Sequence, residues 1–197
     1  MKTVHQHQLG FSLVEVLVSI TILLMVIVGP MTMISRANNS TSFATEQINA
    51  WFLAQEGLEL IEKQRDDYLL EHLAGTRANP WTDFKTGAKL AKCFAADGCG
   101  VTIASGASPS VSVVDCTTGV LCKLYIDAAP ARSSYVYDAA GGSNAPSLFT
   151  RVITMDSVAG FPNEVKVTAT VTWRTGTLIS SQKVEVTTYL FNIYDKP

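Results

Sequence analysis

The sequence has few charged residues and none of the common catalytic motifs. Asp, Glu, Lys and Arg make up only 16% of its 197 residues, and the Lys and Arg residues form no basic stripe that could follow a nucleic-acid backbone. A Walker phosphate loop, an HExxH zinc motif and an EF-hand loop are all missing. We therefore expect no enzymatic activity, no cofactor, no small-molecule substrate and no nucleic-acid partner.

What the sequence does contain is one long apolar run. Residues 10–34 read GFSLVEVLVSITILLMVIVGPMTMI, and a helix of about 20 apolar residues, rising 1.5 Å per residue, is long enough to span a bilayer. The run holds a single charge, that of Glu15. A carboxylate inside a membrane segment costs roughly 2.5–3.5 kcal/mol, so Glu15 is a candidate functional residue.

Three interpretations of this segment are open. The first is a plain signal anchor. The second is a secretory signal peptide cut after Ala37, although its apolar core would be about twice the usual 7–15 residues. The third is cleavage after Gly10 on the cytoplasmic side, which leaves the apolar helix on the mature protein. Lys2 precedes the run and Arg36 follows it, so the positive-inside rule does not decide between them.

The stretch GFSLVEVLVSITIL favours the third interpretation, because it closely resembles the processing motif of type IV pilins and pseudopilins. The resemblance implies that prepilin peptidase, a membrane aspartic peptidase, cuts after Gly10. It also implies that the new first residue, Phe11, is N-methylated and that Glu15 matters for assembly. Cleavage would free an ammonium group at Phe11, about one helical turn before Glu15. Because both charges need partners in an apolar filament core, we expect Glu15 to pair with Phe11 of its own or a neighbouring chain.

The same resemblance implies a location, partners and a function. Before assembly the chain is expected to cross the inner membrane once, with its head outside the cytoplasm. It would then join other pilin subunits through its first helix, in a surface pilus or a periplasmic pseudopilus. Residues 54–67, AQEGLELIEKQRDD, resemble a run in PilV-type minor pilins, which implies a minor pilin that primes or caps a filament. The alternatives are a pseudopilin of a type II secretion or DNA-uptake system and a pilus-associated adhesive module.

One long helix is predicted from residue 11 to about residue 72. Gly29 and Pro30 are expected to break or kink it, because proline removes a helical hydrogen bond and clashes with the preceding turn. Glu56, Glu59 and Glu62 form either a docking face or, as is commoner for such a run, a solvated face. Residues at helical spacing after residue 47 predict a stripe that packs on a sheet: Ile48, Trp51, Ala54, Leu58, Ile61, Arg65 and Tyr68.

The four cysteines are spaced as two C-x5-C pairs: Cys93, Cys99, Cys116 and Cys122. An even number of cysteines after an export-type segment predicts disulfides in an oxidising compartment. We favour the two local pairs, and the nested pairing is nearly as plausible. Structural zinc sites use more closely spaced cysteines, so we expect no metal site.

The carboxy-terminal region has the clearest strand pattern. Residues 148–155, 164–173 and 178–191 are predicted strands, and the alternation of apolar with polar residues in the last two predicts an antiparallel sheet with one solvated face. Before them, residues 74–89 are expected to form a loop anchored by Trp81 and Phe84. Shorter strands are expected at residues 100–104, 110–114, 120–126 and 134–137.

These elements predict an α+β fold, in which a long amino-terminal helix packs on an antiparallel sheet that forms the head. The expected division of the chain is a leader peptide (1–10), a transmembrane and assembly helix (11–34), the amphipathic half of that helix (35–73), a loop-rich region with the cysteines (74–146) and the carboxy-terminal sheet (147–197).

Overall fold

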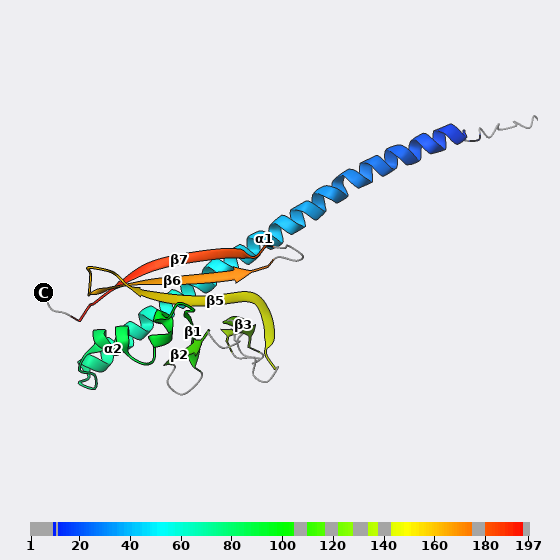
Figure 1. Cartoon of the computed structure of the whole chain (residues 1–197). Coiled ribbons are helices and arrows are strands. Elements are labelled where there is room, and N and C mark those ends of the chain that lie inside the picture. Colours follow the sequence, from blue (N-terminus) through cyan, green and yellow to red (C-terminus); the bar gives the residue numbers. More distant parts are fainter. Residues whose placement is uncertain are drawn as a thin grey trace, which may run out of the picture. The chain divides into compact units, whose positions relative to one another are not determined.

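The computed structural model describes residue 10 and residues 12–104, 110–116, 122–127, 134–137, 143–174 and 180–194. Most of the predicted leader, Phe11 and parts of the region 74–146 lie outside the described residues. The chain forms two compact units, Met1–Ala44 and Thr45–Pro197. Figure 1 labels both α-helices and most of the strands.

The predicted long helix is present and continuous. Helix α1 runs from Leu13 to Leu73, and it passes through Gly29 and Pro30 in helical conformation, so the break predicted there is absent. A proline removes only one helical hydrogen bond, and nearby Ser or Thr hydroxyls can bond to the backbone around it. Thr32 does so here, since its hydroxyl donates to the carbonyl oxygen of Gly29 at 2.8 Å.

The part of α1 that belongs to the second unit packs on the sheet through a stripe of nine buried residues: Ala50, Leu53, Ala54, Gly57, Leu58, Leu60, Ile61, Gln64 and Tyr68. The prediction was wrong for Ile48 and Trp51, which are 56% and 45% exposed. The stripe begins instead at small residues, because the helix approaches the sheet closely. A Cβ atom added at Gly57 would lie 2.6 Å from Cδ1 of Ile153.

In the described part of the chain, seven strands form one sheet: β1 (Cys99–Ala104), β2 (Ser110–Asp115), β3 (Lys123–Ile126), β4 (Tyr135–Val136), β5 (Ala145–Ser157), β6 (Glu164–Trp173) and β7 (Gln182–Phe191). All of the strand pairs are antiparallel. Together with α1 they confirm the α+β class and the helix-on-sheet arrangement.

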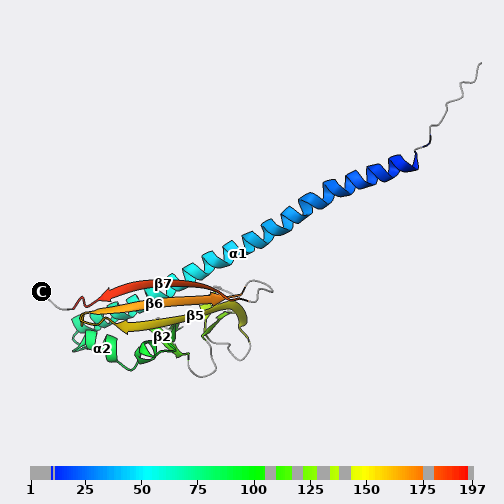
Figure 2. The same ribbon diagram turned by 45° about the horizontal axis from the view of Figure 1, so that its top comes forward.

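Strand β5 is the centre of the sheet. Strand β6 pairs with one edge of β5, and β7 pairs with β6. Figures 1 and 2 both show β5, β6 and β7 side by side. Strands β1 and β3 share the other edge of β5, where β1 continues to β2 and β3 to β4.

Strand β6 shows the predicted alternation. Its odd-numbered residues, from Val165 to Trp173, are all buried, and they belong to the single hydrophobic core that also contains the α1 stripe. Met155 of β5 and Thr188 of β7 pair with Val167 on either side. The pleat therefore places one face of the sheet against the helix.

The segment between α1 and the sheet was only partly predicted. It was expected to be a loop, but Pro80–Thr86 form a short helix, α2, and Ala91–Phe94 form a 3₁₀ turn. Proline near the first position of a helix has a suitable φ and lacks only an N–H that would be unpaired anyway. Trp81 and Phe84 are buried anchors, as predicted.

Candidate functional site

The predicted processing site lies at an exposed end of the chain. Gly10 is exposed, and no atom outside its own neighbourhood lies within 4 Å of the position that a Cβ would occupy. Phe11 lies outside the described residues. Helix α1 begins two residues later, at Leu13, and the Val16 N–H donates to the carbonyl oxygen of Ser12 at 3.2 Å.

Glu15 occupies the first turn of α1 and is exposed. A carboxylate is favoured there, because the first turn of a helix carries unpaired N–H groups and the positive end of the helix dipole. The hydroxyl of Ser19 donates to the backbone carbonyl of Glu15 at 2.7 Å. Among the described residues, no hydrogen bond or ion pair to the Glu15 carboxylate is found, and the side chain is exposed.

The large side chains in the apolar half of α1 are exposed within their own unit. Those from Leu13 to Ile34 are all 45% exposed or more, and those of Met25 and Leu13 are 79% and 76% exposed. The hydroxyls of Ser19, Thr21 and Thr32 bond to carbonyls of their own helix, as Thr21 does to the carbonyl of Val18 at 2.8 Å. A continuous apolar surface of this length requires lipid or protein around it, and α1 is long and apolar enough to cross a membrane.

The comparison with protein families identifies this segment. Residues 5–29 match the family described as the prokaryotic N-terminal methylation motif. The match supports a precursor of the type IV pilin and pseudopilin kind, whose members are structural proteins. It is also consistent with anchoring in a membrane before incorporation into a filament. Neither the curated proteins nor the solved structures gave a match.

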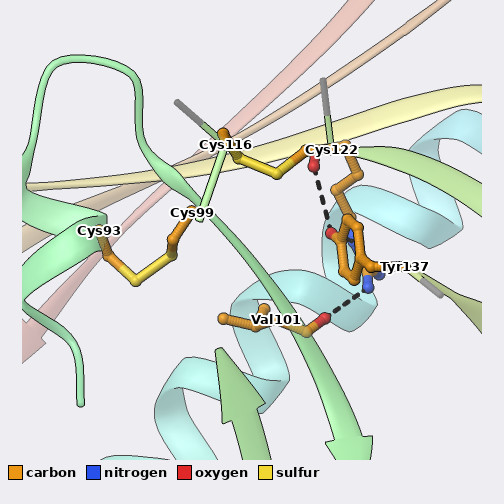
Figure 3. The surroundings of a disulfide bond; sticks show 7 residues. Cys93, Cys99, Val101, Cys116, Cys122 and Tyr137 are labelled. Atoms are coloured by element: carbon orange, nitrogen blue, oxygen red, sulfur yellow. Dashed lines mark hydrogen bonds between the residues drawn. A yellow bond between two sulfur atoms is a disulfide. The ribbon is translucent and has the colours of Figure 1, made fainter. Parts of the chain in front are cut away.

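The head of this chain, the unit Thr45–Pro197, contains two disulfides. Cys93 bonds to Cys99 and Cys116 bonds to Cys122, which is the local pairing that the spacing favoured. All four cysteines are used, so they are not available to hold zinc. Figure 3 shows both disulfides together with Val101 and Tyr137.

A buried arginine lies beside the two disulfides and joins the sheet to the helix. Arg151 of β5 is 0% exposed, and its guanidinium donates four hydrogen bonds. One goes to the Tyr137 hydroxyl at 2.8 Å, one to the Val101 carbonyl at 2.7 Å, one to the Leu53 carbonyl at 2.9 Å and one to the Glu56 carboxylate at 2.7 Å. We call these five residues the Arg151 cluster. It connects α1, β1, β5 and the residue after β4.

The interactions within the cluster determine the protonation states of Arg151 and Tyr137. Burial by itself would lower the pKa of Arg151, but Tyr137 and Glu56 together raise that pKa above its ordinary value. Burial raises the pKa of Tyr137, and the nearby Arg151 opposes this only in part. Arg151 is therefore charged and Tyr137 neutral at physiological pH, which matches the hydrogen bonds that they make.

The disulfides brace two of the elements that meet at Arg151. Cys99 is the first residue of β1, two residues before Val101. The Cys122 carbonyl accepts a hydrogen bond from the Arg151 backbone N–H at 3.0 Å. Cys122 has a φ of 44°, in the left-handed region that few residues other than glycine adopt. Each disulfide therefore helps to position a backbone carbonyl that accepts a hydrogen bond from Arg151. These are the carbonyls of Val101 and Cys122.

The predictions from the sequence did not include the Arg151 cluster. Arg151 occurs in an ordinary strand pattern, and Glu56 was placed in a run of acidic residues that is usually a solvated face. Glu56 is exposed, as a solvated face predicts, and its side chain is 47% exposed, but its carboxylate also accepts a hydrogen bond from Arg151. Glu59 and Glu62 are exposed, as expected. A charged residue at an inward-facing strand position was the one available signal, because such a residue needs a buried partner.

Proposed function

We propose that this chain is a minor pilin, processed after Gly10, methylated at Phe11 and assembled into a type IV pilus-like filament through α1. The methylation motif supports a pilin-type precursor. The observation that carries the proposal is the exposed apolar half of α1 with one exposed carboxylate, that of Glu15, in its first turn. A head braced by two disulfides suits a subunit that functions outside the cytoplasm.

The proposed mechanism links processing to assembly. Cleavage after Gly10 creates an ammonium group at Phe11, and that group does not exist in the precursor. In the low-dielectric interior of a filament, an unpaired carboxylate is costly, and pairing with an ammonium lowers that cost. When the Glu15 carboxylate of one subunit meets the Phe11 ammonium of a neighbour, the axial position of the two helices is set. Only processed chains could then enter the filament.

The proposed partners follow from this mechanism. Prepilin peptidase would recognise the segment around Gly10, and the apolar half of α1 would be held by the inner membrane until assembly. Other pilin subunits would then replace lipid around the same surface. The large apolar side chains from Leu13 to Ile34 would therefore be covered first by lipid and later by neighbouring helices.

Mass spectrometry of the mature amino terminus tests the processing step. We expect a chain that begins with N-methylated Phe11 when it is expressed with its peptidase and methylase. A Gly10→Val variant should stay at precursor length, because the peptidase site that accepts glycine would have to make room for the valine side chain. An intact Met1 in the wild-type chain isolated from filaments would refute the proposal.

Substitution of Glu15 tests the assembly step. Glu15→Gln keeps the shape of the side chain and removes its charge, and we expect normal insertion, cleavage and methylation but loss of the subunit from sheared filaments. Glu59→Gln makes the same chemical change on an exposed part of α1 and should assemble normally. Normal incorporation of Glu15→Gln would contradict the ion-pair mechanism even if processing occurs as proposed.

The abundance of the subunit tests the minor role. In surface filaments purified from the producing cells, a minor pilin should be present at a small fraction of the major subunit. Gold-labelled antibodies to the head should mark the tip or rare positions along a filament. Continuous labelling along the whole filament would identify a major subunit, and secretion defects without any surface filament would favour a pseudopilin.

A further inference from the structure

The head contains a cavity that neither the methylation motif nor the proposed assembly mechanism uses. Its volume is about 340 Å³, which is at the small end of the usual range for ligand sites, roughly 300–1,000 Å³. It lies where the end of α1, helix α2, the β5–β6 connection and the segment after β7 meet. Its lining consists of His72, Ala78, Asn79, Pro80, Trp81, Thr82, Asn163, Asn192 and Tyr194.

One wall of the cavity is aromatic, and its rings are held in place. The Trp81 ring stacks on Phe84 with centroids 5.5 Å apart, and its centroid is 6.4 Å from that of Tyr194. The indole N–H donates to the carbonyl of Pro162 at 3.1 Å, and the Tyr194 hydroxyl donates to the carbonyl of Arg65. Protein acceptors already bind both polar groups, and only 9% of Trp81 is exposed. The partly exposed Tyr194 ring therefore offers the carbon surface to a ligand.

Other lining residues bring amide and imidazole groups. Asn79 precedes α2 but makes no side-chain capping hydrogen bond to it. The Asn163 side-chain oxygen accepts a hydrogen bond from the Asn192 amide at 3.2 Å, which leaves the Asn163 amide nitrogen as a donor. His72 uses Nδ1 for the carbonyl of Arg77 at 2.8 Å, so its Nε2 is the other ring nitrogen available for hydrogen bonding. The cavity therefore offers both donors and acceptors.

The charge of the cavity limits the class of ligand. Among the described residues that line it, none is Asp, Glu, Lys or Arg. A strongly anionic or cationic ligand would thus have no counter-charge in the described part of the wall. A purely apolar ligand would cover the exposed amides of Asn79 and Asn163 without offering them hydrogen-bond partners, which is unfavourable.

We infer that this cavity binds a neutral saccharide, with one sugar ring against the partly exposed Tyr194 ring and its hydroxyls bonded to Asn79 and Asn163. A sugar ring has C–H faces that suit aromatic carbon, and each hydroxyl both donates and accepts, as an amide side chain does. The small volume suits one terminal sugar of a longer glycan. Such a site would let the head attach to a glycosylated surface.

The direct test is saturation-transfer NMR on the full mature chain. The chain is kept in a zwitterionic detergent, because detergents with sugar headgroups would compete for the site. Glucose, galactose, mannose, N-acetylglucosamine and N-acetylgalactosamine are offered one at a time. We expect saturation transfer to the ring protons of at least one of these sugars. Absence of transfer to all five sugars, or transfer only to a neutral tripeptide included for comparison, would overturn the inference.

A matched pair of variants locates the binding. Asn79→Ala should weaken binding about tenfold or more and leave the thermal unfolding midpoint unchanged, because the Asn79 side chain does not cap α2. Asn49→Ala makes the same change at an exposed position of α1 and should bind like the parent chain. Equal affinity of Asn79→Ala and the parent would refute the site.

Assembly and sugar binding can fail separately. The Glu15→Gln variant should bind the same sugar as the parent, since Glu15 belongs to the other unit. An assembling chain that binds no sugar would refute this inference and leave the proposed minor-pilin function standing. A chain that binds sugar but is never processed would support this inference and refute the proposed minor-pilin function.

Discussion

Removal of the buried guanidinium should show how the head is attached to α1. We consider Arg151→Met, which keeps a flexible chain of similar length and removes the charge and all of the donors. In the parent chain Arg151 reaches Leu53 and Glu56 on the helix and Val101 and Tyr137 on the sheet side. The variant therefore loses all four hydrogen bonds by which the Arg151 guanidinium joins the helix to the sheet.

The magnitude follows from what is left unpaired. The Leu53 carbonyl lies inside a helix and can keep its helical hydrogen bond, because a carbonyl oxygen has two lone pairs. Val101 and Tyr137 lose a charge-assisted bond, and such bonds contribute about 1.5–3 kcal/mol each. The methionine recovers part of this, since a buried charge no longer needs to be desolvated. We expect Arg151→Met to lower the free energy of unfolding by about 2–4 kcal/mol.

Glu56 supplies the matched comparison. Its side chain is 47% exposed, so water can replace part of its interaction, and Glu56→Gln should cost only about 1 kcal/mol. In the Arg151→Met background the same change should cost almost nothing, because its partner is gone. Glu59→Gln, an exposed acid on the same helix, should stay within about 0.5 kcal/mol of the parent.

Urea unfolding of the mature chain in detergent, followed by tryptophan fluorescence, measures all of these free energies. Trp173 is buried in the head and reports on the core between sheet and helix. If Arg151→Met unfolds at the same urea concentration as the parent, or if Glu56→Gln is as damaging in the Arg151→Met background as alone, the account of the cluster is wrong.

Three further changes test separate features of the head. Replacing both Cys116 and Cys122 by serine should cost about 2 kcal/mol, as expected for a short disulfide loop, and should lower the urea midpoint. Gln64→Met should raise stability by about 1 kcal/mol, because Oε1 of Gln64 is buried without a hydrogen-bond partner in the described part of the chain. Burial raises the pKa of Tyr194 to about 12 from 10.0, so its neutral form stabilises the fold below pH 10 and this contribution is lost as the pH rises toward 12. Burial also raises the pKa of Tyr137 and that of Tyr68, so an ultraviolet titration should show several late tyrosines, of which Tyr194→Phe removes one. A late titration that is unchanged in Tyr194→Phe would contradict the assignment.

Short-range patterns were enough for the regular elements and failed at close contacts. Strand β6 was predicted from Glu164 to Trp173 because alternation reports directly on the two faces of a strand. The helix stripe was misplaced at Ile48 and Trp51, since large apolar residues were taken as the buried ones. The helix comes close enough to the sheet that Gly57 and its small neighbours form the contact instead.

The sequence by itself determined the processing motif, the membrane-length helix with its one acid and the succession of the main strands along the chain. Each of these depends on residues that are neighbours in the sequence. Only the tertiary structure decided that Glu56 meets Arg151 and that Asn79, Asn163 and Tyr194 line one cavity. Glu56 and Arg151 are far apart in sequence, as are the lining residues of that cavity. These contacts depend on how the sheet packs on α1, and no pattern of neighbouring residues predicts that packing.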